Sequence, residues 1–283
     1  MAENNFSLQK TLTMLLDEKK YHSLRDILST MNPADIAAIF DDLDQACLPL
    51  LFRLLPKELA AETFVEMEPE AQELLIRGFS DSELKEVIDE LYVDDAVDIV
   101  EEMPANVVQR ILSQAEPDMR KQINEILRYP EDSAGSIMTT EYVSLRPNMT
   151  VEEAILRIRR TGIDKETIYT CYVTRGHKLI GLTSVKDLLL CEDDDATIES
   201  IMQEHVITVG TLDDKEQVAQ MFSKYNFLAL PVVDTEDRLV GIVTFDDAMD
   251  VMEAEATEDM EKMAAITPTD KPYLKTGVVS TFK

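Results

Sequence analysis

Hydrophobic and polar positions alternate with a helical period over the first part of the chain, up to residue 131. Prolines punctuate this part at similar intervals, and proline is well tolerated at the start of a helix, where its missing N–H is not needed. The pattern predicts short helices over residues 33–40, 56–64 and 104–112, and it continues without proline over residues 80–88 and 93–100. Short amphipathic helices in series indicate an all-helical superhelical domain over residues 1–131, with an ordinary helical bundle as the alternative.

Beyond residue 131 the pattern changes to apolar runs of strand character, and this new pattern occurs twice. The run 169–173 is followed by Gly181-Leu-Thr-Ser-Val-Lys-Asp187, and the run 227–233 is followed by Gly241-Ile-Val-Thr-Phe-Asp-Asp247. Each copy predicts a strand, a turn and a second strand, and then a helix that opens at a Ser or Thr with an Asp three residues later.

The duplication extends upstream of these motifs. Ser136-Ile-Met138 recurs as Ser200-Ile-Met202, 64 residues later, whereas the two glycine motifs lie 60 residues apart. The first copy therefore carries four extra residues, which we place around residues 162–166. A repeat of this length predicts an α+β architecture of two β-α-β-β-α units that pack face to face and leave a cleft between them.

The two glycine motifs resemble the signature of the CBS domain pair, a regulatory module, over roughly residues 132 to 252. The resemblance implies an adenine nucleotide, ATP or AMP, whose ribose is held by the Asp and whose phosphate faces the Ser or Thr. A helix N-terminus suits a phosphate because its first N–H groups are free and its dipole is positive there. The candidate nucleotide-binding residues are Tyr169, Ser184, Lys186, Asp187, Thr244 and Asp247. The alternative is that Ser184 and Thr244 are plain helix caps beside dipole-favoured Asp residues.

Composition narrows the possible partners. The chain has 283 residues, 45% of them hydrophobic, with 56 acidic against 27 basic residues and a net charge of −29. This charge argues against nucleic acid and anionic membrane surfaces as direct partners, and it favours cations. The three cysteines lack metal-ligand spacing and the three histidines form no cluster, so we expect reduced structural thiols and surface histidines. Neither a signal peptide nor a run of 18 apolar residues is present, and we expect the chain as given to be soluble.

Acidic residues are concentrated in two stretches. Asp94 and Asp98 are four positions apart, which places both carboxylates on one helical face. The second stretch holds eight carboxylates between residues 246 and 261, on a helix that we predict over residues 246–265 with an apolar stripe formed by Met249, Met252, Ala256, Met260 and Met263. Like charges three or four positions apart destabilise a helix, so bases, dilute salt or divalent cations must compensate them. Oxygen ligands without His or Cys indicate Mg²⁺ or Ca²⁺, and a solvated acidic face is the alternative.

The succession of an acidic helical domain, a CBS pair and an acidic helix resembles the cytosolic region of MgtE-type magnesium transporters over the whole chain. The resemblance implies an N-domain over 1–131, CBS domains over 132–198 and 199–252, and a connecting or plug helix with a linker over 253–283. It also implies the Mg²⁺ ligands, with backbone carbonyls at the Gly and Ser positions: Glu62, Asp94, Asp95, Asp98, Gly135, Ser136, Glu216, Ser223, Asn226, Asp246, Asp247, Asp250, Glu255, Glu258 and Asp259. Asn226 departs from the family pattern, which has an Asp there, and its amide oxygen brings no charge.

The resulting hypothesis is a Mg²⁺-sensing and gating region at the cytoplasmic face of the membrane. Mg²⁺ would bridge acidic residues of the N-domain, the CBS pair and the plug helix and favour the closed state of a pore. We expect a homodimer through the CBS domains, because the apolar stretches 155–158 and 218–222 exceed what one small sandwich covers, and we expect a transmembrane pore domain to follow. We expect no enzyme, since the sequence shows no nucleophile–His–acid set and no Gly-rich phosphate loop. The alternative function is a freestanding CBS-pair sensor of adenine nucleotides.

Overall fold

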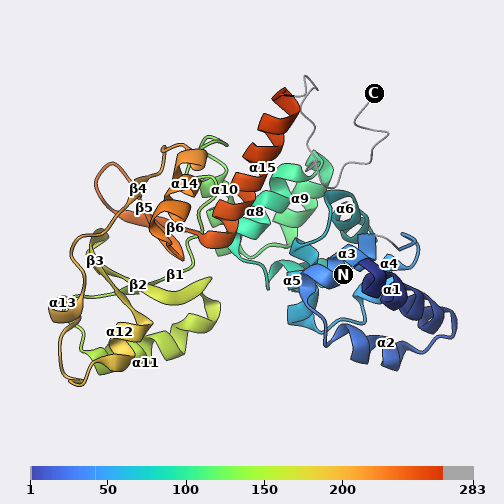
Figure 1. The fold of residues 1–283 in the computed structure, drawn as a ribbon, viewed down its shortest axis with the longest axis horizontal. Helices are drawn as coiled ribbons and strands as arrows, with labels where there is room; N and C mark the ends of the chain where they lie inside the picture. Colours follow the sequence, from blue (N-terminus) through green and yellow to red (C-terminus); the bar gives the residue numbers. More distant parts are fainter. Residues whose placement is uncertain (1, 42, 264–283) are drawn as a thin grey trace. The chain divides into compact units, whose positions relative to one another are not determined.

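The computed structural model of the chain describes residues 2–41 and 43–263. The chain divides into two compact units, Met1–Ile123 and Asn124–Lys283. The first unit is helical, and the second holds both sheets (Figure 1). Within the described residues, none of the helices combines the length and the hydrophobicity that crossing a membrane requires.

The first unit is built from short helices in series. They are α1 (Ala2–Asp17), α2 (Tyr21–Leu28), α3 (Pro33–Asp41), α4 (Leu48–Phe52), α5 (Lys57–Val65), α6 (Pro69–Gly78), α7 (Asp81–Ile88), α8 (Val93–Glu102) and α9 (Ala105–Gln114), and α10 (Pro117–Ile126) extends across the boundary between the units. Helix α3 packs against α5, α5 against α7 and α7 against α9, while α4 packs against α6. Contacts between next-but-one neighbours are what a stack of short helices produces, so the predicted helical architecture is confirmed.

Prolines mark the helix starts in two ways. Pro33, Pro69 and Pro117 are the first residues of α3, α6 and α10. Pro56 and Pro104 are instead the N-caps of α5 and α9, with extended ψ angles of 152° and 144°. Because only the carbonyl of an N-cap residue joins the helix, these two helices begin one residue later than predicted.

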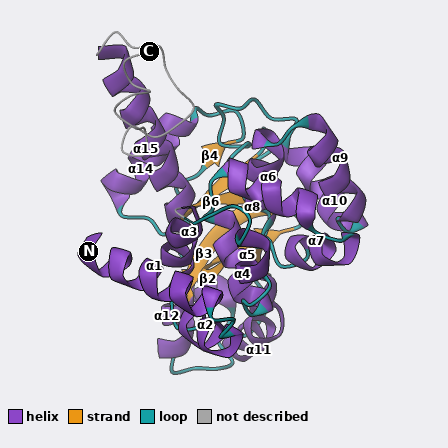
Figure 2. Ribbon diagram, turned by 90° about the vertical axis from the view of Figure 1, so that its right-hand side faces the viewer, coloured by secondary structure: helices purple, strands orange, loops and turns teal. Residues whose placement is uncertain are grey.

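The second unit contains two three-stranded sheets of the same topology. The first sheet has the order β1 (Tyr142–Leu145), β2 (Thr167–Arg175), β3 (Lys178–Ser184), and the second has the order β4 (Val209–Gly210), β5 (Ala229–Val233), β6 (Leu239–Thr244). In each sheet the first strand runs parallel to the middle strand and the third runs antiparallel to it. Figure 2 shows the strands in orange.

Helices complete each repeat around its sheet. They are α11 (Val151–Thr161) and α12 (Val185–Leu190) in the first repeat, α13 (Ile198–Ile201) and α14 (Lys215–Tyr225) in the second, and α15 (Phe245–Met263), which follows β6. The extra residues of the first copy fall at a short 3-10 turn, η1 (Gly162–Asp164), between α11 and β2. The predicted duplication and the position of the insertion are therefore confirmed.

The two repeats hold each other through the segments that the sequence duplicates. A Cβ atom on Gly181 would lie 2.6 Å from the sulfur of Met202, and a Cβ atom on Gly241 would lie 2.6 Å from the sulfur of Met138. Backbone bridges pair the residue after each of these glycines with the residue after the opposite methionine. Each motif therefore needs a glycine because the Ser-Ile-Met segment of the other repeat lies directly against it.

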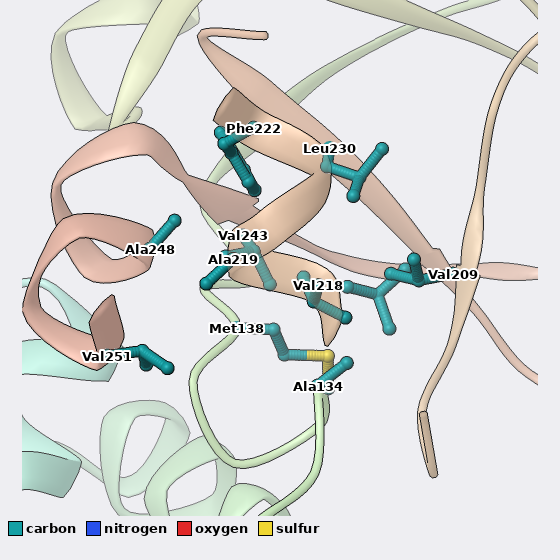
Figure 3. Close-up of a cluster of buried hydrophobic side chains, with 11 residues drawn as sticks. Ala134, Met138, Val209, Val218, Ala219, Phe222, Leu230, Val243, Ala248 and Val251 are labelled. Carbon is teal, nitrogen blue, oxygen red and sulfur yellow. The ribbon is translucent and has the colours of Figure 1, made fainter. Parts of the chain in front are cut away.

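A hydrophobic core shown in Figure 3 holds the first turns of α15. Ala248 and Val251 of α15 pack with Val218, Ala219 and Phe222 of α14, and all five side chains are at most 8% exposed. The start of α15 is thus part of the second repeat, and it is fixed against α14.

One prediction about apolar surface was wrong. The methionine stripe is not the packing face of α15, since Met249, Met252 and Met260 are 46%, 36% and 56% exposed and the packing face follows Ala248 and Val251 instead. The side chain of Met263 and the predicted continuation over residues 264–283 lie outside the described residues. In the stretches 155–158 and 218–222, Ile158, Val218 and Phe222 are buried in the cores of their own repeats, whereas Leu156 is 40% exposed, and the homodimer stays a prediction.

Candidate functional site

Three of the predicted metal ligands meet on one face of α14 and α15. Glu216 lies in the first turn of α14, and Glu255 and Glu258 lie one turn apart on α15. Desolvation, followed by the negative charges of Glu216 and Glu258, raises the pKa of the Glu255 carboxyl, while Lys215 and Lys262 act in the opposite direction. The structure therefore brings together acids that are far apart in the sequence, and their mutual repulsion exceeds what the nearby lysines offset.

The neighbouring bases and amides satisfy part of this acidic face. Lys262 Nζ lies 2.6 Å from Glu258 Oε1, and Gln220 Nε2 donates to Glu216 Oε1 at 3.0 Å. Asp259, another predicted ligand, is exposed on the same helix. The face retains an excess of negative charge and carboxylate oxygens, which are the ligands that a hard divalent cation prefers.

The predicted carbonyl ligands of Gly135 and Ser136 lie on a loop that is fixed to the segment before Glu216. The N–H of Gly135 donates to the carbonyl of Thr211 at 2.9 Å, and the N–H of Lys215 donates to the carbonyl of Asp132 at 3.0 Å. A Cβ atom on Gly135 would lie 2.9 Å from that same Thr211 oxygen, so the loop requires glycine there. The Ser136 hydroxyl donates within the loop, which leaves its backbone carbonyl as the group that the resemblance indicates.

The C-terminal end of α14 holds Ser223 and Asn226. Ser223 is exposed in the last turn, and Asn226 is the C-cap in the left-handed conformation, with φ of 56°. The Asn226 N–H donates to the carbonyl of Phe222 at 2.8 Å. Among residues with a side chain, asparagine is one of those that adopt this conformation most readily, so local backbone geometry explains Asn at a position where the family pattern has Asp.

The start of α15 carries Asp246, Asp247 and Asp250. Thr244 precedes the first residue of α15 and donates to Asp247 Oδ2 through its hydroxyl at 2.5 Å and its N–H at 3.3 Å. Burial, with added repulsion from Asp246 and Asp250, raises the pKa of Asp247 to about 6, although the Thr244 hydrogen bonds oppose the shift. Asp247 therefore serves as part of a helix cap and also holds its charge at a free-energy cost.

The remaining predicted ligands lie in the first unit. Glu62 is exposed on α5, and α8 carries Asp94, Asp95 and Asp98. Asp94 is only 5% exposed, whereas Asp98, one turn later, is exposed. The predicted spacing of these two carboxylates on α8 is thus present, although their exposure to solvent differs.

A further acidic group in the first unit was not singled out from the sequence. Desolvation, followed by the charges of Glu68 and Glu70, raises the pKa of Glu102. Glu68 and Glu70 flank the start of α6, and Glu102 ends α8. Helix stacking brings these helix ends together, and the only sign of this acidic group in the sequence was the pair of acidic residues around Pro69.

Within residues 2–41 and 43–263, no three His, Cys, Asp or Glu side chains form a ready-made metal centre, and the ligand set stays a prediction.

Three of the six predicted nucleotide-binding residues line a cavity of about 520 Å³ in the CBS-like pair. The lining residues are Tyr169, Thr170, Ser184, Val185, Lys186, Leu189, Leu190 and Leu228. Leu228 comes from the second repeat, so the cavity lies in a cleft between the two copies. Its volume is in the range of small-molecule sites, and its lining combines apolar side chains with a hydroxyl and an amine.

Asp187, Thr244 and Asp247 do not line this cavity. Asp187 instead completes a capping box with Ser184, whose hydroxyl donates to Asp187 Oδ2 at 2.7 Å while the Asp187 N–H donates to Ser184 Oγ at 3.0 Å. The capping box that was weighed as the alternative is thus complete at Ser184, beside the cavity, whereas at Thr244 the described bonds are its donations to Asp247.

Comparison with known proteins follows the same division of the chain. A family model described as the MgtE intracellular N domain matches residues 31–132, and the CBS domain model matches residues 134–192 and 198–254. The magnesium transporter MgtE of Thermus thermophilus is 39% identical over 96% of this chain and 61% of its own length. The magnesium transporter MgtE of Bacillus subtilis is 32% identical over 93% of this chain and 59% of its own length, so the chain spans about three fifths of these relatives.

Solved structures agree with these relatives. The cytosolic domain of the Mg²⁺ channel MgtE in complex with ATP superposes with a TM-score of 0.81 at 38% identity, covering 86% of this chain and 99% of that one. The soluble part of a magnesium transporter also gives a TM-score of 0.81, at 33% identity, covering 90% of this chain and 100% of that one. The relatives that match most of this chain are thus transporters and their cytosolic parts.

Proposed function

Because the chain belongs to the MgtE family of magnesium transporters, we propose that it is the Mg²⁺-sensing and gating region on the cytosolic side of such a transporter. In this role Mg²⁺ is the ligand that reports the cytosolic supply. Carboxylates of the helical unit, the CBS pair and α15 bind it jointly and thereby favour the closed state of a membrane pore. The chain acts as a homodimer through its CBS pair and as a regulatory part that has no enzymatic activity.

The observation that carries this proposal is the acidic face of α14 and α15. Desolvation and then the charges of Glu216 and Glu258 raise the pKa of Glu255, so ionised Glu255 is held there at a free-energy cost. A divalent cation bound there removes this repulsion, so the face gains more from Mg²⁺ than from a monovalent ion at equal ionic strength. The anchored start of α15 then transmits the change, since Ala248 and Val251 fix it in the core of the second repeat.

The acidic residues of α8 extend the same mechanism to the first unit. Without a cation, Asp94 and Asp98 and the acids of α15 disfavour any close approach of the two units. Mg²⁺ shared between the two groups reverses this preference. Since bound Mg²⁺ keeps several waters, each bridge is weak and the response is graded over the concentrations that a sensor must cover.

The cavity beside Ser184 supports a second, compatible role, which is adenine-nucleotide binding to the CBS pair. Tyr169 is 67% exposed at the cavity and offers a ring face, and Lys186 offers a cation for phosphate. A relative whose structure superposes on this chain was solved in complex with ATP. A freestanding nucleotide sensor accounts for this cavity but leaves the acidic face of α14 and α15 without a purpose, so the Mg²⁺ function ranks first.

The test is isothermal titration of Mg²⁺ into the wild-type chain and into the Glu216→Gln/Glu255→Gln variant. The matched control is Glu152→Gln/Glu192→Gln, which removes two exposed carboxylates elsewhere in the same unit. We expect the first variant to weaken Mg²⁺ binding about tenfold or more and the control to leave it within about twofold. Equal weakening in both variants would show that the acids are only a diffuse solvated surface, and ATP titrated in parallel separates the nucleotide role.

A further inference from the structure

A larger cavity in the CBS pair, of about 740 Å³, lies at the tip of the β2–β3 hairpin. Its lining residues are Tyr142, Ser144, Arg146, Pro147, Asn148, Arg157, Thr174, Arg175, Gly176, His177, Glu199 and Leu239. It shares no lining residue with the cavity beside Ser184. The hairpin tips of the two repeats meet here, because the Leu239 N–H donates to the His177 carbonyl at 3.0 Å, so both repeats contribute to the site.

The charge of this cavity is opposite to that of the chain. Three guanidinium groups, from Arg146, Arg157 and Arg175, face a single lining carboxylate, Glu199. Over the first CBS match, residues 134–192, eight Lys and Arg stand against seven Asp and Glu, whereas over the second match, 198–254, three stand against twelve. Within the CBS pair, the basic residues are therefore concentrated in the first repeat, in a chain whose net charge is −29.

The second repeat provides an internal comparison for these residues. At the offsets that align the repeats, Arg146 corresponds to Gly210 and Arg157 to Met221. At the hairpin tip, His177 corresponds to Asp237. The second repeat builds the same sheet and helix without any of these bases, so the fold itself does not require them in the first repeat.

Local interactions also fail to account for Arg146, which precedes α11, and for Arg157, which lies on α11. Glu153 is one turn before Arg157, a favourable spacing for an ion pair, but its carboxylate accepts the Thr150 N–H at 3.1 Å in a capping box. Arg146 precedes the N-terminus of α11, where the helix dipole disfavours a positive charge. Within the described part of the chain, neither Arg146 nor Arg157 forms an ion pair, whereas Arg175 Nη2 lies 2.7 Å from Glu199 Oε1.

We propose that this cavity binds the phosphate group of a small phosphorylated molecule. Arginine is suited to this role because its planar guanidinium presents paired N–H donors that match phosphate oxygens. The Ser144 and Thr174 hydroxyls, 2.9 Å apart, and the Asn148 amide supply neutral hydrogen-bonding groups.

The rest of the ligand has room and a suitable lining. The cavity volume falls within the range of small-molecule sites and far exceeds a bare phosphate ion. Tyr142, Pro147 and Leu239 offer apolar surface for an organic part. Since Glu199 and Leu239 belong to the second repeat, a bound ligand stabilises the junction between the repeats, at a site separate from the acidic face of α14 and α15.

The test is calorimetric titration of inorganic pyrophosphate into the full chain, in Mg²⁺-free buffer at fixed ionic strength. The variant Arg146→Gln/Arg157→Gln is compared with Arg159→Gln/Arg160→Gln, which removes the same charge from exposed positions on α11 that do not line the cavity. We expect the first variant to weaken pyrophosphate binding about tenfold or more and the control to leave it within about twofold. Circular dichroism monitors folding, and Arg157→Met, which installs the residue of the second repeat, is the fallback variant.

A second arm separates the sources of phosphate. AMP and pyrophosphate are each titrated into Tyr169→Ala/Lys186→Gln, a variant of the cavity beside Ser184. Tighter binding of AMP identifies a nucleotide as the ligand class, and binding of pyrophosphate alone identifies a simpler phosphate compound. The proposal is overturned if neither probe binds the wild type, if both arginine pairs weaken binding equally, or if the Tyr169→Ala/Lys186→Gln variant abolishes pyrophosphate binding.

Discussion

Replacing Asp247 by Asn should stabilise the chain more at neutral pH than at acidic pH when Mg²⁺ is absent. Burial and the charges of Asp246 and Asp250 raise the pKa of Asp247 to about 6 in the folded chain, and an unfolded Asp titrates near about 3.9. Between these values the folded state binds a proton more tightly than the unfolded state. The stability that Asp247 contributes is therefore present below about pH 4 and is lost as the pH rises through about 6.

The magnitude follows from the same shift. Raising a carboxyl pKa from 3.8 to about 6 corresponds to roughly 3 kcal/mol, at about 1.36 kcal/mol per pKa unit. Asparagine keeps an oxygen that accepts the Thr244 hydroxyl and N–H, so the cap survives while the charge is removed. The unfolding free energy of the variant minus that of the wild type should therefore increase by up to roughly 3 kcal/mol between pH 4 and pH 7.

The assay is chemical denaturation followed by circular dichroism at several pH values in Mg²⁺-free buffer. Asp187→Asn is the matched control, because Asp187 has the same capping position in the first repeat but is exposed. We expect a much smaller pH-dependent change for that variant. The reasoning would be refuted if the unfolding free energy of Asp247→Asn relative to the wild type stayed constant from pH 4 to pH 7, or if it decreased. Saturating Mg²⁺ at pH 7 should stabilise the wild type more than Asp247→Asn, since only the wild type has the carboxylate ligand.

Three further substitutions test the fold that supports the sites. Gly241→Ala places a methyl group 2.6 Å from the sulfur of Met138, so thermal melting should show a loss of about 1–3 kcal/mol, and an unchanged melting temperature would contradict the packing described for the repeats. Glu83→Gln removes the carboxylate that pairs with Arg53, and this pair together with the cap lowers the pKa of Glu83 to about 2. The wild type should therefore be more stable than the variant above about pH 4.5 and should lose this difference as the pH falls toward 2. Acid-denaturation curves of the same shape for both proteins would argue against the pair. Val251→Ala removes two buried methyl groups at the root of α15 and should cost about 1–2 kcal/mol in denaturant titrations, whereas no loss would mean that α15 is not fixed there.

Much of the fold was readable from the sequence because the same short motif recurs in two copies. Gly181 and Gly241 aligned the two copies, and Ser184 and Thr244 marked the helix starts, whereas the close contact that requires each glycine appears only in the structure. The packing face of α15 was not readable. Methionine and alanine positions both fit a helical stripe, and only the position of α14 decides that Ala248 is buried and Met249 is not.

The site was predictable to a lesser degree for a related reason. Asp94 and Asp98 lie on one helix, so their shared face follows from helical geometry alone. The closeness of Glu216 to Glu255 depends on how α14 packs against α15, and the sequence indicated it only through the family resemblance. The arginine cavity was missed altogether, because its residues come from separate strands and helices and no local spacing connects them.

The two repeats show how one backbone can carry opposite chemistry. Asp187 and Asp247 occupy the same capping position, but α12 ends after 6 residues and leaves Asp187 exposed, whereas α15 continues for 19 residues and packs its first turns into the core beside Asp247. Asp247 is thus half-buried beside Asp246 and Asp250, and the longer helix carries further acids, Glu255 and Glu258, toward Glu216. In the first repeat the helix after the motif is shorter and carries fewer acids, and arginines from the loop after β1, from α11 and from the end of β2 line one cavity. The two repeats therefore share a scaffold but differ in charge, with three basic against twelve acidic residues in the second match and eight against seven in the first, and this difference is the basis for proposing a cation site in one and a phosphate site in the other.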